Sequence, residues 1–476
     1  MPNHIGFLKY KRENPTKRSI VTRIQDFREF EQPLPAERLQ EQAARCMDCG
    51  VPYCHVFGCP VKNRIPDWND MVYRRQWRRA LDILHSTNNF PEITGRICPE
   101  PCEAACTLSL NQPAVTIRHI ELQIVERGFE EGWILPELAP YNTRKKIAII
   151  GSGPAGLATA QQLARLGHNV VVFEKADKIG GLLRYGIPDF KLEKWVIERR
   201  LEQMMKEGVI FENEVNVGTD ISVHYLKRTF DSTVITTGSA IPRDIDIPGR
   251  QLQGIHFAMD FLTQQNKRVA GEQISVEEEI SAHNKNVVVI GGGDTGSDCI
   301  GTSRRQGAKK ITQIEILPEP PIEREPYNPW PTWPNIMRTS SSHEEGCERI
   351  WSILTKEFIG ENGHVQKIRC VKLQWSNPDN NGRRQFKVIP DSDFETEADL
   401  VLLATGFIHV EHGSLITDNN LQLDNCGNII INSDYMTTVP GVFAAGDCVM
   451  GASLVVRAIY QGRQVAKGVN RYLESQ

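Results

Sequence analysis

Hydrophobic residues follow two periodicities along the chain, and the change between them divides it. In the first 140 residues apolar positions recur at helical intervals, as from Asp67 to Leu84. Beyond that point, short apolar runs lead into glycine-rich turns and then into helices, over 146–174 and again over 286–317. This order predicts an α/β protein in which a helical N-terminal domain precedes two nucleotide-binding domains.

The first glycine-rich turn has the features of a dinucleotide site. A buried strand over 147–150 leads into Gly151-Ser-Gly153-Pro-Ala-Gly156 and a helix over 157–166. Gly151 permits a tight turn, Gly153 lets the backbone approach a pyrophosphate, and Gly156 allows close helix packing. A second apolar run ends at Glu174, an acid placed to bind ribose hydroxyls. The motif therefore predicts a Rossmann-like domain.

A later signal belongs to the same domain and indicates FAD. The run 441–447 ends in Gly-Asp, which in flavoproteins with two dinucleotide sites places the aspartate against the flavin. A helix over 452–462 would then aim its N-terminal dipole at the flavin ring. We predict these FAD contacts: Gly151, Gly153, Gly156, Glu174, Gly181, Leu182, Arg184, Gly446 and Asp447.

The second glycine-rich turn, at 291–296, predicts a nicotinamide dinucleotide site inserted between two halves of the flavin domain. Its second strand, over 311–317, has no clear acid where Glu174 stands, although Glu315 is near. Basic pairs at 304–305 and 309–310 favour NADPH over NADH, the alternative being that they form a solvated basic helix end. The predicted contacts are Gly291, Gly293, Asp294, Thr295, Gly296, Arg304 and Arg305.

The domain boundaries follow from these motifs. We expect a helical domain over 1–140, the first half of the FAD domain over 141–250, the nicotinamide dinucleotide domain over 251–408 and the second FAD half over 409–476. A segment rich in Pro and Trp, 318–334, is too dense in proline for a helix or a central strand. We interpret it as an ordered surface loop, with contact to a partner as the alternative.

Seven of the twelve cysteines lie in two runs within the helical domain. The first run, ending in Cys59-Pro60, has ferredoxin-like spacing, in which the last cysteine serves a different cluster. The second run repeats every four residues, a helix-like spacing. Seven thiolates suit two four-iron clusters that lack one ligand, while zinc and unligated core cysteines remain alternatives. The candidate ligands are Cys46, Cys49, Cys54, Cys59, Cys98, Cys102 and Cys106.

Composition narrows the setting. The formal net charge of −4 gives no electrostatic case for binding nucleic acid, and no apolar run reaches the length of a membrane span. The first 30 residues lack the apolar core of a signal peptide. We therefore expect a cytoplasmic protein, in which clustered cysteines are metal ligands or redox groups and not disulfides.

Together these motifs resemble the small (beta) subunit family of bacterial NADPH-dependent glutamate synthase. The resemblance covers essentially the whole chain, and its most specific parts are 46–60, 65–69, 95–99 and 101–106. The same module resembles the N-terminal half of dihydropyrimidine dehydrogenase and the large subunit of flavin-based transhydrogenases. It implies two 4Fe-4S clusters, one bound by Cys46, Cys49, Cys54 and Cys106, the other by Cys59, Cys98 and Cys102.

The resemblance also implies an eighth cluster ligand that is not cysteine. Glu121 is the nearest match, with an ordinary helix glutamate as the alternative; His119 and His55 match less well. We name no catalytic side chain, because the cofactors carry the chemistry.

The implied function is electron input to glutamate synthase. NADPH would give a hydride to FAD, and single electrons would pass through the clusters to a large (alpha) subunit that makes L-glutamate from L-glutamine and 2-oxoglutarate. In this family the large subunit hydrolyses glutamine with an N-terminal cysteine, whereas the second residue here is Pro2. The chain also has no room for the FMN-binding barrel that would reduce 2-iminoglutarate. The glutamate-forming chemistry is therefore expected on the separate subunit. One alternative is an NAD(P)H oxidoreductase of the same architecture that feeds ferredoxin or another acceptor; another is a redox sensor with structural clusters.

Overall fold

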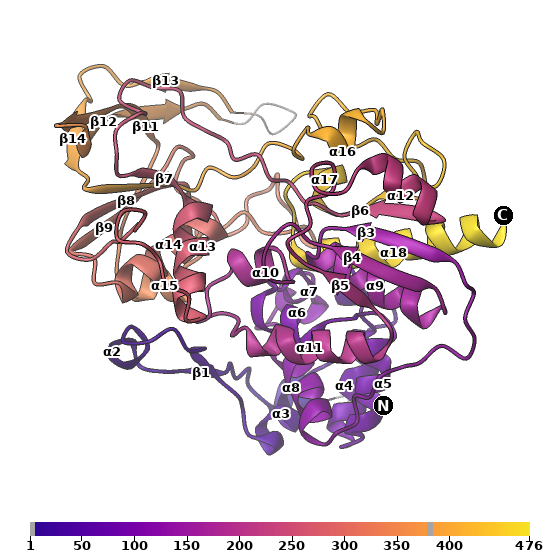
Figure 1. The fold of residues 1–476 in the computed structure, drawn as a ribbon. Coiled ribbons are helices and arrows are strands. Elements are labelled where there is room, and N and C mark those ends of the chain that lie inside the picture. Colours follow the sequence, from indigo (N-terminus) through magenta and orange to yellow (C-terminus); the bar gives the residue numbers. More distant parts are fainter. Residues whose placement is uncertain (1–4, 378–383) are drawn as a thin grey trace.

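The computed structural model describes residues 5–377 and 384–476. Figure 1 shows a helical domain below two α/β domains that lie side by side. This arrangement confirms the fold class expected from the sequence. The chain enters the helical domain, builds most of the first α/β domain, crosses into the second, and returns to the first for its last strand and helices.

The helical domain forms around one apolar stripe per helix. Between Asp67 and Leu84 the expected short helices are confirmed, and Arg75, whose φ of 60° is left-handed, lies between the two. Trp68, Val72 and Leu84 are fully buried. The domain contains α1 (Gly6–Lys9), β1 (Thr16–Lys17), α2 (Ile20–Arg23), β2 (Glu31–Gln32), α3 (Ala36–Ala43), η1 (Cys54–Gly58), α4 (Ile65–Tyr73), α5 (Trp77–His85), α6 (Pro91–Ile97), α7 (Pro101–Ala104), η2 (Thr107–Leu110) and α8 (Ile117–Glu130).

The first α/β domain has a parallel sheet in the order β16-β6-β3-β4-β5. Strands β3, β6 and β16 are buried on both faces, as parallel strands are when helices cover them. The elements are β3 (Lys146–Ile150), α9 (Pro154–Arg165), β4 (Asn169–Phe173), α10 (Leu182–Tyr185), α11 (Trp195–Lys206), β5 (Ile210–Glu212), α12 (Val223–Thr229), β6 (Ser232–Ile235), α16 (Ser414–Thr417), β16 (Val442–Ala444), α17 (Asp447–Met450) and α18 (Val455–Glu474).

The second α/β domain has a parallel sheet in the order β10-β9-β8-β15-β7. An antiparallel sheet of β11, β12, β13 and β14, which the sequence reading did not anticipate, extends from it. The elements are β7 (Ile255–Phe257), α13 (Ala258–Val269), β8 (Asn286–Ile290), α14 (Asp294–Arg305), β9 (Lys310–Glu315), α15 (Ser341–Glu344), β10 (Glu348–Trp351), β11 (Ile353–Glu361), β12 (His364–Trp375), β13 (Phe386–Val388), β14 (Phe394–Glu397) and β15 (Leu400–Leu403).

The helical domain and the first α/β domain share one hydrophobic core, which runs from Leu39 and Trp68 through Ile147 and Leu163 to Val465. A buried ion pair joins them too: Arg200 of α11 donates from Nε and Nη2 to the two carboxylate oxygens of Glu92 on α6, at 2.7 and 2.8 Å. The shared core and this ion pair therefore hold the two domains in a fixed relation.

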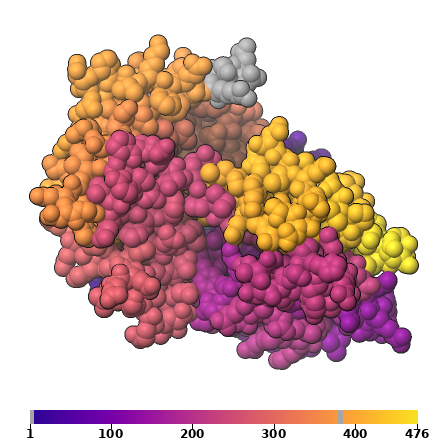
Figure 2. All heavy atoms as spheres, turned by 45° about the horizontal axis from the view of Figure 1, so that its top comes forward, coloured from indigo at the N-terminus to yellow at the C-terminus, as the bar shows by residue number. Residues whose placement is uncertain are grey.

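The N-terminal arm reaches the other α/β domain. In Figure 1, α2 lies below α15, and Arg23 forms ion pairs with Glu344 and with the buried Glu345. Figure 2 shows the lobe of residues 255–377 and 384–403 meeting the lobe that carries the C-terminal helix along a furrow. Among the described residues, none of the helices combines the length and apolarity needed to cross a bilayer.

Candidate functional site

The loop after β3 has the backbone that a dinucleotide pyrophosphate needs. Gly151 has a φ of 99°, which favours glycine, and a Cβ on Gly156 would lie 2.0 Å from the Gly151 carbonyl oxygen. Next to Gly153, by contrast, a Cβ would meet nothing within 4 Å. The N-terminus of the twelve-residue helix α9 therefore faces open space, and an anion fits there.

The acid after β4 is held in place by this loop. One carboxylate oxygen of Glu174 accepts hydrogen bonds from the backbone N–H and the hydroxyl of Ser152, and the other accepts from the Ala176 N–H. The Ser152 hydroxyl oxygen also accepts from the Gly180 N–H, at 2.9 Å. The turn at Gly180 and Gly181 thus packs against the loop. Glu174 is fixed with its carboxylate beside the glycine turn, where a ribose would lie.

The C-terminal part of the chain closes the same site. Gly446 donates its N–H to the Gln461 side chain at 2.6 Å, and Ser453 donates its hydroxyl to Asp447. Burial raises the pKa of the Asp447 carboxyl. Helix α18 begins at Val455, three residues later than expected, after the short helix α17 that starts at Asp447.

Two further predicted flavin contacts lie on α10. Leu182 is 43% exposed. The buried Arg184 donates to the Ile179 carbonyl oxygen and to Glu198, both at 2.6 Å, so its guanidinium already has protein partners.

The loop after β8 repeats the first one. Gly291 has a φ of 126°, a Cβ on Gly296 would lie 2.4 Å from the Gly291 carbonyl oxygen, and Gly293 again faces open space. Asp294 and Thr295 open helix α14. The sequence showed Glu315 only as an acid near the place that corresponds to Glu174. In the structure it is the last residue of β9 and contacts Gly292.

The two arginines expected to bind the 2′-phosphate of NADPH lie elsewhere. Arg304 and Arg305 end α14, which at 1.5 Å per residue puts them roughly 16 Å from its N-terminus. Arg305 is buried in an ion pair with Glu345 and stacks on Phe190, while Arg304 donates to the Gly346 carbonyl oxygen. Sequence spacing placed them near the second strand, but the helix carries them away. Their predicted role has no support in the geometry.

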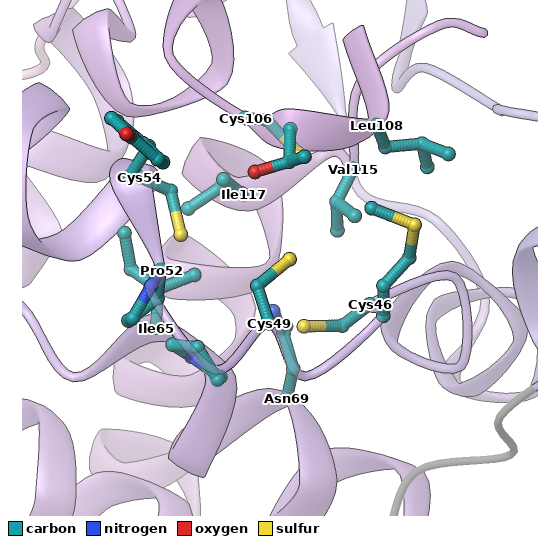
Figure 3. Close-up of a pocket in the computed structure, with 14 residues that line it drawn as sticks. Cys46, Cys49, Pro52, Cys54, Ile65, Asn69, Cys106, Leu108, Val115 and Ile117 are labelled. Carbon is teal, nitrogen blue, oxygen red and sulfur yellow. The ribbon is translucent and has the colours of Figure 1, made fainter. Parts of the chain in front are cut away.

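Four cysteines from separate segments surround one space in the helical domain. Figure 3 shows Cys46, Cys49, Cys54 and Cys106 around this space, with Ile65, Asn69, Val115 and Ile117 beside them. Burial raises the pKa of the Cys46 thiol to about 12. Among residues 5–377 and 384–476, no three His, Cys, Asp or Glu side chains converge closely enough to hold a single metal ion. The four sulfurs form a wider ring, and cysteine thiolates are the ligands of iron–sulfur clusters.

A second group lies nearby. Cys59, Cys98 and Cys102 interact electrostatically with one another and with Glu121 of α8. The Glu121 carboxylate accepts hydrogen bonds from Asn88, Asn63 and Thr94, and burial raises its pKa to about 7. The structure therefore brings Cys59, Cys98 and Cys102 together with Glu121. His119 instead accepts from the Leu34 N–H.

The spacing of the second cysteine run does not produce a helix. Cys98 ends α6 in an extended conformation, Glu100 has a left-handed φ of 64°, and only Pro101–Ala104 are helical. Proline at 99 and 101 interrupts the helix. The short helix α7 then ends at Ala104, and Cys106 follows it in an extended conformation beside Cys46, Cys49 and Cys54, so the run contributes to both groups.

Two residues near the cysteines lie in segments that the sequence singled out, but no role was predicted for them individually. The fully buried Asn69 amide lies against Cys46 and makes no other hydrogen bond within the described part of the chain. It is a polar group aimed at the cysteine ring, where a cluster sulfide would be its partner. Trp330, from the segment rich in Pro and Trp, contacts the Tyr53 ring at a centroid distance of 4.7 Å. That segment is a loop that packs against the cysteine domain.

Comparisons with known proteins agree with this geometry. Residues 145–462 match the family model "Pyridine nucleotide-disulphide oxidoreductase", and residues 23–133 match "Dihydropyrimidine dehydrogenase domain II, 4Fe-4S cluster". The solved structure of FprA from Mycobacterium tuberculosis in complex with NADPH is similar, with a TM-score of 0.56 and 18% identity over 70% of this chain and 85% of that one. At that identity the likeness concerns the fold alone.

Curated relatives are much closer in sequence. The glutamate synthase (NADPH) small chain of Mycobacterium tuberculosis is 49% identical, covering 98% of this chain and 95% of the relative. That of Bacillus subtilis is 42% identical, with 98% of each covered. The glutamate synthase (NADH) of Schizosaccharomyces pombe is 46% identical over 98% of this chain but only 22% of that longer protein.

Fold, glycine loops and cysteine groups together define an oxidoreductase of the pyridine nucleotide-disulphide class that carries a 4Fe-4S domain at its N-terminus. The matches to the bacterial small chains span nearly the whole of this chain and nearly the whole of each relative. The chain belongs to the glutamate synthase small chain family.

Proposed function

We propose that this protein is the electron-input subunit of a glutamate synthase. It oxidises a reduced nicotinamide dinucleotide; the names of its small-chain relatives specify NADPH. It delivers the electrons to a large subunit that forms L-glutamate from L-glutamine and 2-oxoglutarate. The family relationship over 98% of the chain is the observation that carries this proposal. When bound, FAD accepts a hydride and hands electrons on singly to iron–sulfur clusters.

The chain's own residues hold these groups. The FAD pyrophosphate would lie on the N-terminus of α9 beside Gly153, with the adenosine ribose against Glu174 and Asp447 close to the flavin. The matched open space at Gly153 and Gly293 supports a second dinucleotide on α14. Deep burial of Glu174 excludes water from the ribose contact, which strengthens its hydrogen bonds.

The cysteines hold two 4Fe-4S clusters in this proposal. Cys46 and Cys59, one from each group, are buried, and burial raises the pKa of their thiols, so iron must displace the protons for them to act as thiolate ligands. Glu121 is the eighth ligand. Two observations support this role. Glu121 lies beside the three-cysteine group, and Asn63, Asn88 and Thr94 orient the two oxygens of its carboxylate.

The electrons leave near Cys54, where the partner docks. Four large apolar side chains are exposed on the loop that carries this cysteine: Val51 at 62%, Tyr53 at 36%, Val56 at 52% and Phe57 at 52%. Apolar residues gathered beside a redox centre suit a protein interface. The twelve cysteines, all of them within the described residues, are free, which supports a reducing compartment, and we place the protein in the cytoplasm.

The test is anaerobic purification with quantitation of iron, sulfide and FAD, followed by titration with NADPH and NADH while the flavin absorbance is followed. We expect bleaching of the flavin and reduction of the clusters, and glutamate formation once a large subunit is added. Colourless protein, or coloured protein that neither nucleotide reduces, would refute the proposal. Electron delivery to ferredoxin without binding to a large subunit would favour the related acceptor oxidoreductase.

The docking surface has its own control. Phe57→Asp should weaken binding to the large subunit while leaving flavin reduction intact. Val276→Asp, at an exposed site on the other α/β domain (87%), should leave the complex unchanged. Equal binding of the large subunit by both variants would mean that the interface does not include Phe57.

A further inference from the structure

The two glycine loops correspond residue by residue, and the correspondence includes the acid. In the first sheet Ile150 pairs with Phe173, and the next residues along the two strands are Gly151 and Glu174. In the second sheet Ile290 pairs with Ile314, and the next residues are Gly291 and Glu315. Glu315 therefore stands at the same level of its sheet as Glu174 does.

The two carboxylates are also held alike. Glu174 accepts the N–H of the residue two positions later, Ala176, at 2.9 Å, and Glu315 accepts that of Leu317 at 3.0 Å. The second oxygen of Glu174 meets Ser152 in the middle of its glycine turn. The second oxygen of Glu315 lies 2.3 Å from the position that a Cβ on Gly292, the counterpart of Ser152, would take. Since Gly292 offers no hydroxyl, this oxygen keeps capacity to accept a hydrogen bond from a ligand.

Among the described residues, the basic side chains predicted to bind a 2′-phosphate do not lie beside Glu315. Lys310 is the first residue of β9, about 16 Å from the end of the strand at which Glu315 lies, and it forms an ion pair with Glu348. Arg304 and Arg305 occupy the far end of α14. The four residues that follow the acid are Ile316, Leu317, Pro318 and Glu319, which bring a second carboxylate and no cation.

Two other arginines come nearer to this loop. Arg338 interacts with Asp294 and stacks on Trp333, with 3.6 Å between its guanidinium carbon and the ring centroid. Arg349 donates to the Arg338 carbonyl oxygen and stacks on Trp351. Both guanidinium groups are thus already stacked on aromatic rings, and they are the residues to test as rivals of Glu315.

We propose that Glu315 binds the 2′- and 3′-hydroxyls of the adenosine ribose and makes NADH the preferred electron donor over NADPH. The ribose hydroxyls donate to a carboxylate that Leu317 already orients. A 2′-phosphate would bring negative charge against this carboxylate and remove the hydrogen bond that the 2′-hydroxyl donates. This inference rests on the proposed function, because it concerns which donor reduces the same flavin.

The experiment compares NADH with NADPH in two ways. Stopped-flow measurement of flavin reduction gives kcat/KM for each donor, and calorimetric titration with NAD⁺ and NADP⁺ gives the affinities without any reaction. In wild-type protein we expect NADH and NAD⁺ to be favoured at least tenfold. In Glu315→Gln the ratio should move about tenfold toward the phosphorylated nucleotide, with FAD content unchanged. Glu319→Gln, an exposed neighbour with the same change of charge, should leave the ratio at its wild-type value.

Equal or tighter binding of NADP⁺ by the wild-type protein would overturn the inference. So would an unchanged ratio in Glu315→Gln, or an NADPH preference that Arg338→Gln or Arg349→Gln abolishes. Failure of both donors to bleach the flavin would instead overturn the proposed function, so the two ideas fail in different ways.

Discussion

The buried pair between Glu92 and Arg200 should be one of the strongest single contributions to the connection between the cluster domain and the flavin domain. Both side chains are essentially inaccessible, at 0% and 2% exposure, and the pair is bidentate with distances of 2.7 and 2.8 Å. Arg200 also donates to Gln203 and lies over Phe90 and Phe129. We therefore expect Glu92→Ala to leave a guanidinium buried without its counter-charge.

The magnitude follows from that burial. Removing one partner of a buried ion pair costs about 3–5 kcal/mol, because the remaining charge stays out of water. For a cooperative unit of roughly 150–250 residues this lowers the unfolding midpoint by on the order of 10 °C. Replacing both partners by apolar residues, as in Glu92→Leu with Arg200→Met, should cost less than Glu92→Ala alone, since no charge remains buried.

The assay is thermal unfolding followed by circular dichroism and by release of FAD fluorescence, on protein with its cofactors. Asp434→Ala is the matched control, since Asp434 pairs with Arg471 on the surface, where both side chains are more than half exposed and such pairs contribute little. The reasoning fails if Glu92→Ala unfolds at the wild-type temperature, or if the double variant is less stable than this single one.

Three other predictions concern the cofactors and pH. Gly156→Val should yield protein with little FAD by absorbance, because its Cβ would clash with the Gly151 carbonyl oxygen at 2.0 Å; a normal FAD content would contradict the loop assignment. Cys98→Ala should lose about half of the iron and sulfide while FAD stays bound, whereas Cys426→Ala, at an exposed cysteine, should lose none; full iron in the first variant refutes the ligand set. Burial lowers the pKa of His343 to about 4, so between this value and 6.5 the folded state binds fewer protons than the unfolded chain, and stability falls as pH drops through that window. Urea midpoints at pH 5 and 7.5 should differ less in His343→Gln than in wild type. An equal difference in the two proteins would contradict the role of His343 in this pH dependence.

The features that could be predicted from sequence are those built from neighbouring residues. A strand, a glycine turn and a helix N-terminus lie within about ten positions, so the residues around Gly151 and Gly291 carry their own geometry. The helical periodicity from Asp67 to Leu84 is local in the same way. The density of cysteines before Gly151 indicated iron–sulfur chemistry because few other uses of so many thiols fit the cytoplasmic setting that the sequence predicts.

Other features depend on contacts between distant segments. Cys106 joins Cys46 and not Cys98, because the prolines at 99 and 101 break the helix that its spacing suggested. The length and direction of α14 remove Arg305 from the phosphate loop.

The pairing of β8 with β9 brings Glu315 to Gly292, whereas the sequence showed only that an acid is near the expected place. Local chain geometry is set by each residue's own backbone preferences and near neighbours, whereas these relations arise only when burial of apolar faces fixes how strands and helices lie against one another.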